Sequence, residues 1–137
     1  MPFVVDASVA ACWLMLDERH AVAERAFARI AQDPIVAPCL WWFELRNVLM
    51  VSERRGRIDP AQSAKALRLL AALPVAIDME ADEQALMQLA RRRRLTVYDA
   101  AYLELALRKG YPLATLDDAL ADAARAEKAL LIGEGGT

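Results

Sequence analysis

The chain has 137 residues, of which 57% are hydrophobic, and carries a formal net charge of −2. A chain of this length forms one domain and buries roughly 68% of the surface that its unfolded state exposes. The charge balance excludes a protein held to nucleic acid by a strong overall positive field, although the local strip Arg91 to Arg94 can still contribute.

No segment of the sequence predicts secretion or insertion into a membrane. The apolar start is interrupted by Asp6 and lacks the positive n-region of a signal peptide. No run of about 18 uncharged apolar residues is present to span a bilayer. Cys12 and Cys39 fit neither a disulfide framework nor a metal knuckle, so we expect two buried reduced thiols. Together these features predict a cytoplasmic protein.

Short apolar runs with β-branched residues alternate with segments of helical periodicity along the chain. The expected strands are, in order, 3–5, 35–37, 75–77, 113–115 and 130–132. The expected helices are 8–16, 20–31, 40–55, 60–73, 80–93, 96–109 and 118–127. Proline and glycine residues lie between many of these segments, as they do at element boundaries in general.

Local signals predict how several helices begin and which side they bury. Asp6 or Ser8 caps the first helix, Asp17 with Glu18 opens the second, and Asp59 caps the fourth. The second helix has an apolar face formed by Val22, Ala26, Phe27 and Ile30. The fifth helix has a similar face, formed by Ala85, Leu86, Leu89 and Ala90.

Strands that alternate with helices predict an α/β fold. We expect a single domain over residues 1–132, with a short parallel sheet of about five strands covered by helices on both faces. The tail at 133–137 is rich in glycine and is expected to be disordered.

Glu44 lies on the third expected helix at a position where an apolar residue would be expected. Leu40, Trp41 and Val48 lie one turn away, and Asn47 is the only polar neighbour at that spacing. An unpaired carboxylate in such a wall costs several kcal/mol or becomes protonated, so we expect a cation beside it.

Asp99 repeats this pattern on the sixth expected helix. Tyr102 lies one turn away, while Glu104 and Arg108 mark the opposite side, which we expect to face solvent. The spacing from Thr96 to Asp99 is also that of a capping box, so a structural role for Asp99 stays open.

Asp6 and Asp117 each follow an expected strand and, taken singly, are typical N-cap residues. Because the carboxyl ends of parallel strands meet at one edge of a sheet, these two acids can converge with Glu44 and Asp99. Four carboxylates repel one another unless hard divalent cations lie among them. Oxygen ligands without histidine or cysteine favour Mg²⁺ or Mn²⁺ over zinc.

Five stretches resemble the PIN-domain ribonucleases, specifically the toxin half of bacterial VapBC-type toxin–antitoxin pairs. In order, over nearly the whole chain, they are Val4 to Ala10, Glu44 to Leu49, Arg54 to Ile58, Leu95 to Ala106, and Leu113 to Asp117. The resemblance implies a metal-dependent endoribonuclease that acts on RNA, forms a homodimer and is inhibited by a small cognate antitoxin. The family's acidic quartet falls on Asp6, Glu44, Asp99 and Asp117, and its accessory polar positions fall on Ser8, Asn47 and Thr115.

The resemblance also implies a role for each acid in hydrolysis of a phosphodiester bond. Asp6 and Asp99 are expected to bind the metal directly, and Asp117 to help a second ion or its waters. Glu44 is expected to orient or deprotonate the attacking water. The chain departs from the family pattern at Asp118, an additional candidate ligand, and at Arg93, where a glycine is common.

Three other functions have different requirements. A phosphotransferase with an aspartyl-phosphate would need a second carboxylate two residues after Asp6, where the chain has Ser8. A receiver-type module would need a lysine in the strand 113–115, which has none. A catalytically inactive PIN-like module that binds RNA or protein is the alternative to the ribonuclease.

Two groups of side chains outside the quartet admit more than one interpretation. The basic groups Arg91 to Arg94 and Arg54, Arg55 and Arg57 either stabilise helix ends or contact an RNA backbone. His20 is assigned no catalytic role.

Three tryptophans exceed what so small a core normally needs. We expect Trp41 in the core, whereas Trp42 points to a second surface that suits another subunit or an antitoxin, and Trp13 adds to this apolar surplus.

Overall fold

The structure is a computed structural model that describes residues 1–15 and 19–133. The strands are β1 (Phe3–Val5), β2 (Ile35–Pro38), β3 (Val75–Asp78) and β4 (Leu113–Ala114). The helices are α1 (Ala7–Leu14), α2 (Ala21–Arg29), α3 (Cys39–Arg54), α4 (Pro60–Ala72), α5 (Glu83–Arg93), α6 (Val97–Lys109) and α7 (Asp118–Ala126). The predicted role of Asp17 and Glu18, and the predicted disorder of residues 134–137, lie outside the described residues.

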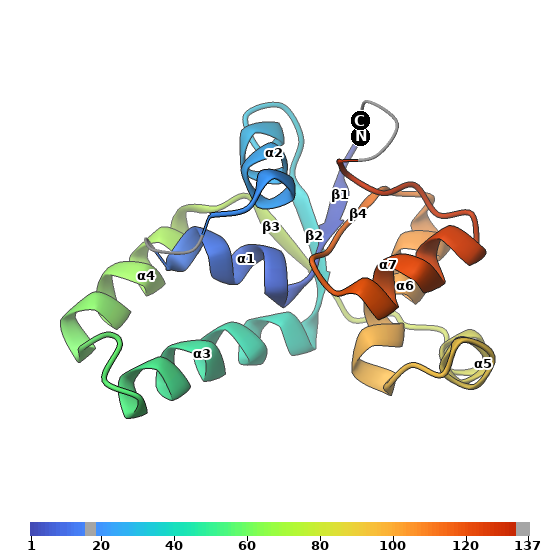
Figure 1. Cartoon of the computed structure of the whole chain (residues 1–137). Helices are drawn as coiled ribbons and strands as arrows, with labels where there is room; N and C mark the ends of the chain where they lie inside the picture. The colour runs from blue at the N-terminus through green and yellow to red at the C-terminus, as the bar shows by residue number, and fades with distance from the viewer. Residues whose placement is uncertain (16–18, 134–137) are drawn as a thin grey trace.

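The strands form one parallel sheet in the order β3-β2-β1-β4. Figure 1 shows α1 to α4 on one side of this sheet and α5 to α7 on the other. Every residue of the central strand β1 is completely buried, because helices cover both of its faces. The predicted α/β class, the parallel sheet and the two helical layers are confirmed.

The prediction of a fifth strand at 130–132 is wrong. Leu131 forms a single parallel bridge with Leu113, whose backbone donates to Leu130 and accepts from Ile132. The partner strand β4 has only two residues, and the chain turns through left-handed conformations at Lys128 and Gly133 on either side of the bridge. The segment is therefore too short and too bent to extend the ladder.

Helix caps agree with the local signals at several positions. The Asp6 carboxylate accepts from the backbone of Val9 and caps α1, and Asp59 forms a complete capping box with Gln62 at the start of α4. α5 begins three residues later than expected because the carboxylate of Asp82 accepts from Ala85 and caps the helix there.

The inner face of α2 differs from the expected one. Phe27 is 44% exposed and packs against Trp13 edge to face, whereas Ala23 and Ala26 face the core. The Trp13 indole donates to the backbone carbonyl of Ala23, which brings α1 and α2 close together and leaves room on that side only for small residues. Trp41 is buried, as expected.

The prediction of two buried thiols is wrong for Cys39 and only partly correct for Cys12. Cys39 is the first residue of α3 and is exposed, while Cys12 is half-buried. A position in the first turn after a proline lies at the surface end of the helix, where apolar neighbours in sequence do not ensure burial.

Glu104 does not face solvent, as we expected, but is 2% exposed. Arg108 donates to the Glu104 carboxylate at 2.8 Å and, with two nitrogens, to Asp78 at the end of β3. Because α5 packs over this side of α6, the side that the helical periodicity marked as polar is a buried interface that contains its own ion pairs.

Two of the arginines at the end of α5 have structural partners. Arg92 and Arg93 both donate to Glu127, at 2.9 and 2.6 Å, and so connect the end of α5 to the end of α7. At the end of α5, Arg94 and not Arg93 has the left-handed backbone conformation that favours glycine, with φ of 54°.

Within residues 1–15 and 19–133 no helix is long and apolar enough to cross a membrane.

Candidate active site

Asp6 lies where β1 passes into α1 and is 5% exposed. Its Oδ1 accepts from the Ser8 hydroxyl at 2.6 Å and from the Val9 amide at 3.1 Å, and its Oδ2 accepts from the Thr115 hydroxyl. Burial raises the pKa of Asp6, and these hydrogen bonds oppose the rise. A carboxylate with three donors is held in one orientation at the carboxyl end of the central strand.

The same two hydroxyls connect the segments that follow β1 and β4. Ser8 Oγ accepts from the Leu116 amide at 2.9 Å, and Thr115 Oγ1 accepts from the Asp117 amide at 3.0 Å. Each hydroxyl therefore donates to Asp6 and accepts from the second segment, so the predicted accessory positions Ser8 and Thr115 join the predicted acids Asp6 and Asp117.

Asp117 caps α7, since its Oδ1 accepts from the Leu120 amide at 2.9 Å. It also lies close enough to Asp6 and Asp99 for its charge to raise the pKa of both. The sequence left open whether Asp117 is a helix cap or part of the acidic site, and the structure is compatible with both roles. One carboxylate oxygen caps the helix, and the negative charge still acts on the neighbouring acids.

Asp99 lies in the first turn of α6 and is half-buried. Thr96 caps this helix by accepting from the Asp99 amide at 3.1 Å. The reciprocal contact of a capping box is found among the described residues at Asp59 and Gln62 but not here. Burial, followed by the charge of Asp117, raises the pKa of Asp99. The Asp99 carboxylate thus accepts no hydrogen bond from the backbone amide of Thr96.

Glu44 is half-buried on α3, and its partner is a hydroxyl and not the cation that we expected. Tyr102 on α6 donates to Glu44 Oε1 at 2.5 Å. Burial is the largest cause that raises the pKa of Glu44, and the charges of Asp6 and Asp99 add to it. The sequence did not single out Tyr102 as the partner of Glu44, although its position three residues after Asp99 places both side chains on one face of the helix.

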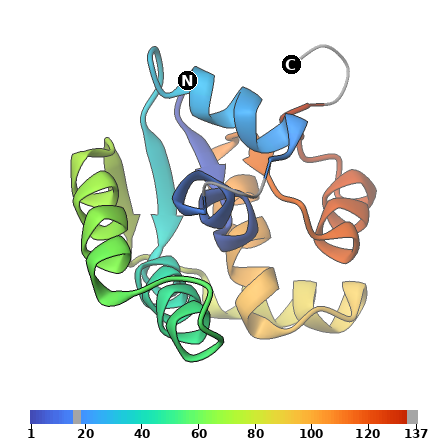
Figure 2. The ribbon, with the colours of Figure 1, turned by 60° about the vertical axis from the view of Figure 1, so that its left-hand side comes forward.

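The four predicted acids act on one another as a closed ring of like charges. Asp117 is coupled to Asp6 and to Asp99, and both of these are coupled to Glu44. In Figures 1 and 2, α3 and the start of α6 lie at the same end of the sheet, which is where the chain leaves β1. No lysine or arginine among the described residues forms an ion pair with any of the four.

The donor set fits a hard divalent cation by its chemistry. It offers carboxylate and hydroxyl oxygens and no nitrogen or sulfur, and no cation of the described residues pairs with its negative charges. No three acidic, histidine or cysteine side chains in the described part of the chain are arranged as a preformed metal site. Asp6 and Glu44 each accept from their own hydroxyl donor, which is Thr115 for Asp6 and Tyr102 for Glu44.

Two further candidates are peripheral to this ring. Asn47 is exposed one turn after Glu44, and no hydrogen bond is present between them. Asp118 is exposed in the first turn of α7, and its charge is not among the causes that raise the pKa of Asp6, Glu44 and Asp99. Asp117, and not Asp118, is therefore the residue whose charge acts on Asp6 and Asp99.

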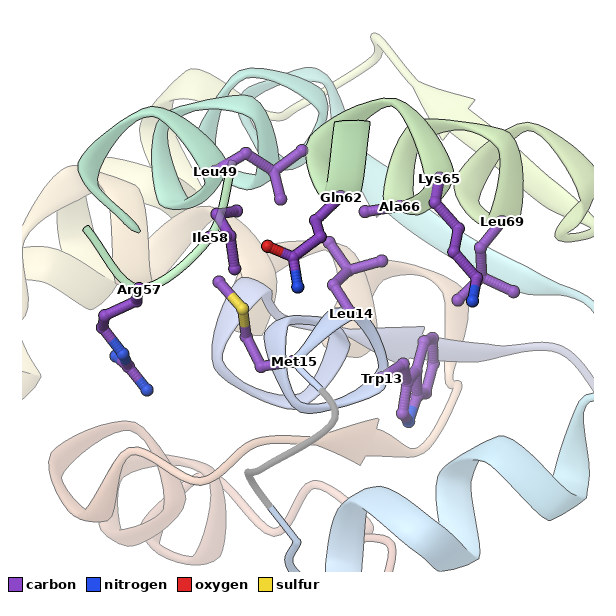
Figure 3. A pocket seen from close by; sticks show the side chains of 10 residues that line it. All are labelled: Trp13, Leu14, Met15, Leu49, Arg57, Ile58, Gln62, Lys65, Ala66 and Leu69. Atoms are coloured by element: carbon purple, nitrogen blue, oxygen red, sulfur yellow. The ribbon is translucent and has the colours of Figure 1, made fainter. Parts of the chain in front are cut away.

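An apolar groove lies away from the acids. It has a volume of about 500 Å³ between α1, α3 and α4 and is mostly apolar, with a polar rim. Figure 3 shows its lining, which is Trp13, Leu14, Met15, Leu49, Arg57, Ile58, Gln62, Lys65, Ala66 and Leu69. A groove of this composition suits an apolar protein segment better than a polar substrate.

Comparison of the sequence with known proteins identifies a family and a relative. A family model described as "PIN domain" matches residues 3–126. Ribonuclease VapC3 from Pyrobaculum aerophilum is 35% identical over 125 residues, which are 89% of this chain and 94% of that protein.

Two crystal structures share the fold. PAE2754 from Pyrobaculum aerophilum superposes with a TM-score of 0.74 at 23% identity, over 96% of this chain and 90% of that one. Mycobacterium tuberculosis VapC20, described as a sarcin–ricin loop cleaving toxin, superposes with a TM-score of 0.63 at 22% identity, over 88% and 94% of the two chains.

Proposed function

The chain belongs to the PIN-domain family, and from this premise we propose that it is an endoribonuclease toxin that hydrolyses RNA phosphodiester bonds with bound Mg²⁺ or Mn²⁺. The observation that carries the proposal is the ring of four charge-coupled carboxylates without a basic partner in the described residues. A purely structural set of acids would be expected to gain stability from lysine or arginine partners, as Asp78 and Glu127 do.

Asp6, Asp99 and Asp117 are the residues that would hold the metal. A carboxylate has about four lone-pair sites, and Asp6 uses three of them for Ser8, Val9 and Thr115. Among the described residues one site on Oδ2 therefore has no donor, and it would be available to a metal ion. When bound, Mg²⁺ or Mn²⁺ lowers the pKa of coordinated water and neutralises charge on the phosphate.

Glu44 is the residue that would orient or deprotonate the attacking water. Its Oε1 accepts from Tyr102, and its Oε2 accepts no hydrogen bond from the described residues. Burial and the neighbouring acids raise its pKa from the ordinary value toward neutral pH, which is the direction that suits a general base.

We further propose a small inhibitory antitoxin as the protein partner. The apolar groove of Figure 3 suits one of its segments, and Lys65, an exposed lining residue, favours an acidic residue on that segment. α1 runs from the acids to the groove over 8 residues, or about 12 Å. One short inhibitor segment can therefore cover both places and bring an arginine to the acids.

A homodimer in the cytoplasm is the proposed state of the free toxin. Trp42 and Phe43 are 45% and 67% exposed next to each other on α3, which is apolar surface that a second copy can bury. The mass of the purified protein by light scattering should correspond to two chains, and Phe43→Ser should shift it toward one. A wild-type mass of one chain would contradict this proposal.

Cleavage of total RNA by the purified chain, freed of any inhibitor, tests the central proposal. Cleavage should require Mg²⁺ or Mn²⁺ and stop in excess EDTA. Asp117→Asn should lower the rate at least about tenfold more than the matched variant Asp118→Asn, because only Asp117 is coupled to the other acids.

Persistent cutting in EDTA would contradict the metal mechanism, and equal losses in the two variants would contradict the assignment of Asp117. RNA binding without cleavage under all of these conditions would instead support the inactive binding module.

A further inference from the structure

Glu44 and Tyr102 are 58 positions apart in the chain and meet across the site. Glu44 projects from α3 and Tyr102 from α6, two helices that lie on opposite sides of the sheet in Figure 1. Among the hydrogen bonds of the described residues, this is the one that joins these two helices through side chains. The contact therefore fixes a catalytic carboxylate of one wall of the site to the other wall.

The Tyr102 side chain is held firmly. It is 2% exposed and is among the largest fully buried side chains of the core. α6 packs against both β1 and β2, and close packing around the ring limits displacement of the Tyr102 hydroxyl. Burial, followed by the hydrogen bond to Glu44, raises the pKa of the Tyr102 hydroxyl above its ordinary value. The hydroxyl therefore stays protonated and can only donate to the carboxylate.

The geometry points to Tyr102 as a positioning residue for the hydrolysis reaction: its hydroxyl fixes Glu44 Oε1 and leaves Oε2 directed at the attacking water. This inference rests on the proposed function, because it assigns the role of Tyr102 within the same site. A glutamate side chain has three rotatable bonds, and a bond of 2.5 Å to a rigid phenol removes most of that freedom. The order is built into the core before substrate binds.

A spectroscopic test examines the pair without any activity measurement. In the proton NMR spectrum of the metal-free chain, a short phenol–carboxylate hydrogen bond should give a hydroxyl resonance downfield of the amide region. Tyr102→Phe and Glu44→Gln should each remove that resonance. Tyr111→Phe, which removes the hydroxyl of a half-buried tyrosine elsewhere on the core, should retain it. Absence of the resonance in the wild-type chain would overturn the pairing.

A kinetic double-mutant cycle tests the role. Tyr102→Phe should lower kcat by about 10- to 100-fold and leave KM for RNA unchanged, while Tyr111→Phe should have wild-type values. In the Glu44→Gln background, Tyr102→Phe should cause no further loss, because it acts through Glu44. A wild-type kcat in Tyr102→Phe, or additive losses in the double variant, would overturn the inference even where the wild type cuts RNA. A wild-type chain that never cuts RNA would contradict the proposed function, and the resonance would then still report on the pair.

Discussion

At the scale of the residue, Asp99 shows how one acid satisfies a helix and a site at the same time. Its backbone amide completes the cap that Thr96 provides, while its carboxylate lies beside the charge of Asp117. Burial and this like charge disfavour the ionised form. Ionised Asp99 therefore reduces the stability of the metal-free fold.

Asp99→Asn should stabilise the metal-free protein by about 1 kcal/mol at pH 7, or about 3–5 °C in Tm. Because the folded pKa of Asp99 is raised, the stability linked to its protonated form is fully present below its unfolded pKa and is lost as pH rises through the folded value. Wild type and variant should thus melt together near pH 3.5 and separate toward pH 7, roughly on either side of the ordinary aspartate pKa.

Thermal melts in EDTA at the two pH values measure this difference. Asp118→Asn is the matched control, since Asp118 is exposed in the first turn of α7 and its loss should leave Tm unchanged or slightly lower. A lower Tm of Asp99→Asn at both pH values would instead identify Asp99 as a capping residue only.

At the scale of the element, α6 organises the molecule through two polar sides. One side carries Asp99 and Tyr102 toward the site. The other carries Glu104 and Arg108 against α5 and the end of β3, where Arg108 binds Glu104 and Asp78 together. These ion pairs keep α6 in register with the sheet, and so they hold the two site residues in place indirectly.

Arg108→Met should destabilise the protein by about 3 kcal/mol, because Glu104 is left buried without its cation. The hydrogen bonds from Arg108 lower the pKa of Asp78. That contribution is present above the unfolded pKa of aspartate and is lost as pH falls through the folded value, so the effect should shrink in acid.

Urea denaturation at pH 7 measures the change, with Arg92→Met as the control. Arg92 is 48% exposed and shares Glu127 with Arg93, so its loss should have an effect below about 1 kcal/mol. Equal effects of the two substitutions would show that the buried pair adds no more than a surface pair.

At the scale of the whole molecule, the site is assembled from four separate parts of the chain. Asp6 follows β1, Glu44 lies on α3, Asp99 on α6 and Asp117 at the start of α7. Only the folded chain brings these charges together, and so a cation that binds among them stabilises the folded state and not the unfolded one.

Millimolar Mg²⁺ should therefore raise the Tm of the wild type. A free concentration of 100 times the dissociation constant adds about 2.7 kcal/mol. Asp99→Asn should lose most of this shift, and Asp118→Asn should keep it, since only the first substitution removes a proposed ligand. Calorimetric melts with and without Mg²⁺ compare the three proteins, and an unchanged shift in Asp99→Asn would exclude it as a ligand.

The sequence by itself determined the local structure and the acids. The β-branched run 3–5, prolines between elements, and caps such as Asp6 and Asp59 act over a few residues, so their patterns predict the elements of an α/β fold. The parallel sheet that follows from alternating strands and helices also predicts that Asp6 and Asp117 meet at one edge.

Only the tertiary structure decided which polar side chains are buried and with which partners. A helical period of 3.6 residues identifies an apolar stripe, but it cannot show that Glu104 is buried with Arg108 or that Glu44 meets Tyr102. In the same way, the two-residue length of β4 reduced the expected fifth strand to one bridge. These outcomes depend on contacts between distant segments, because a buried charge is stable only when packing brings its partner to it.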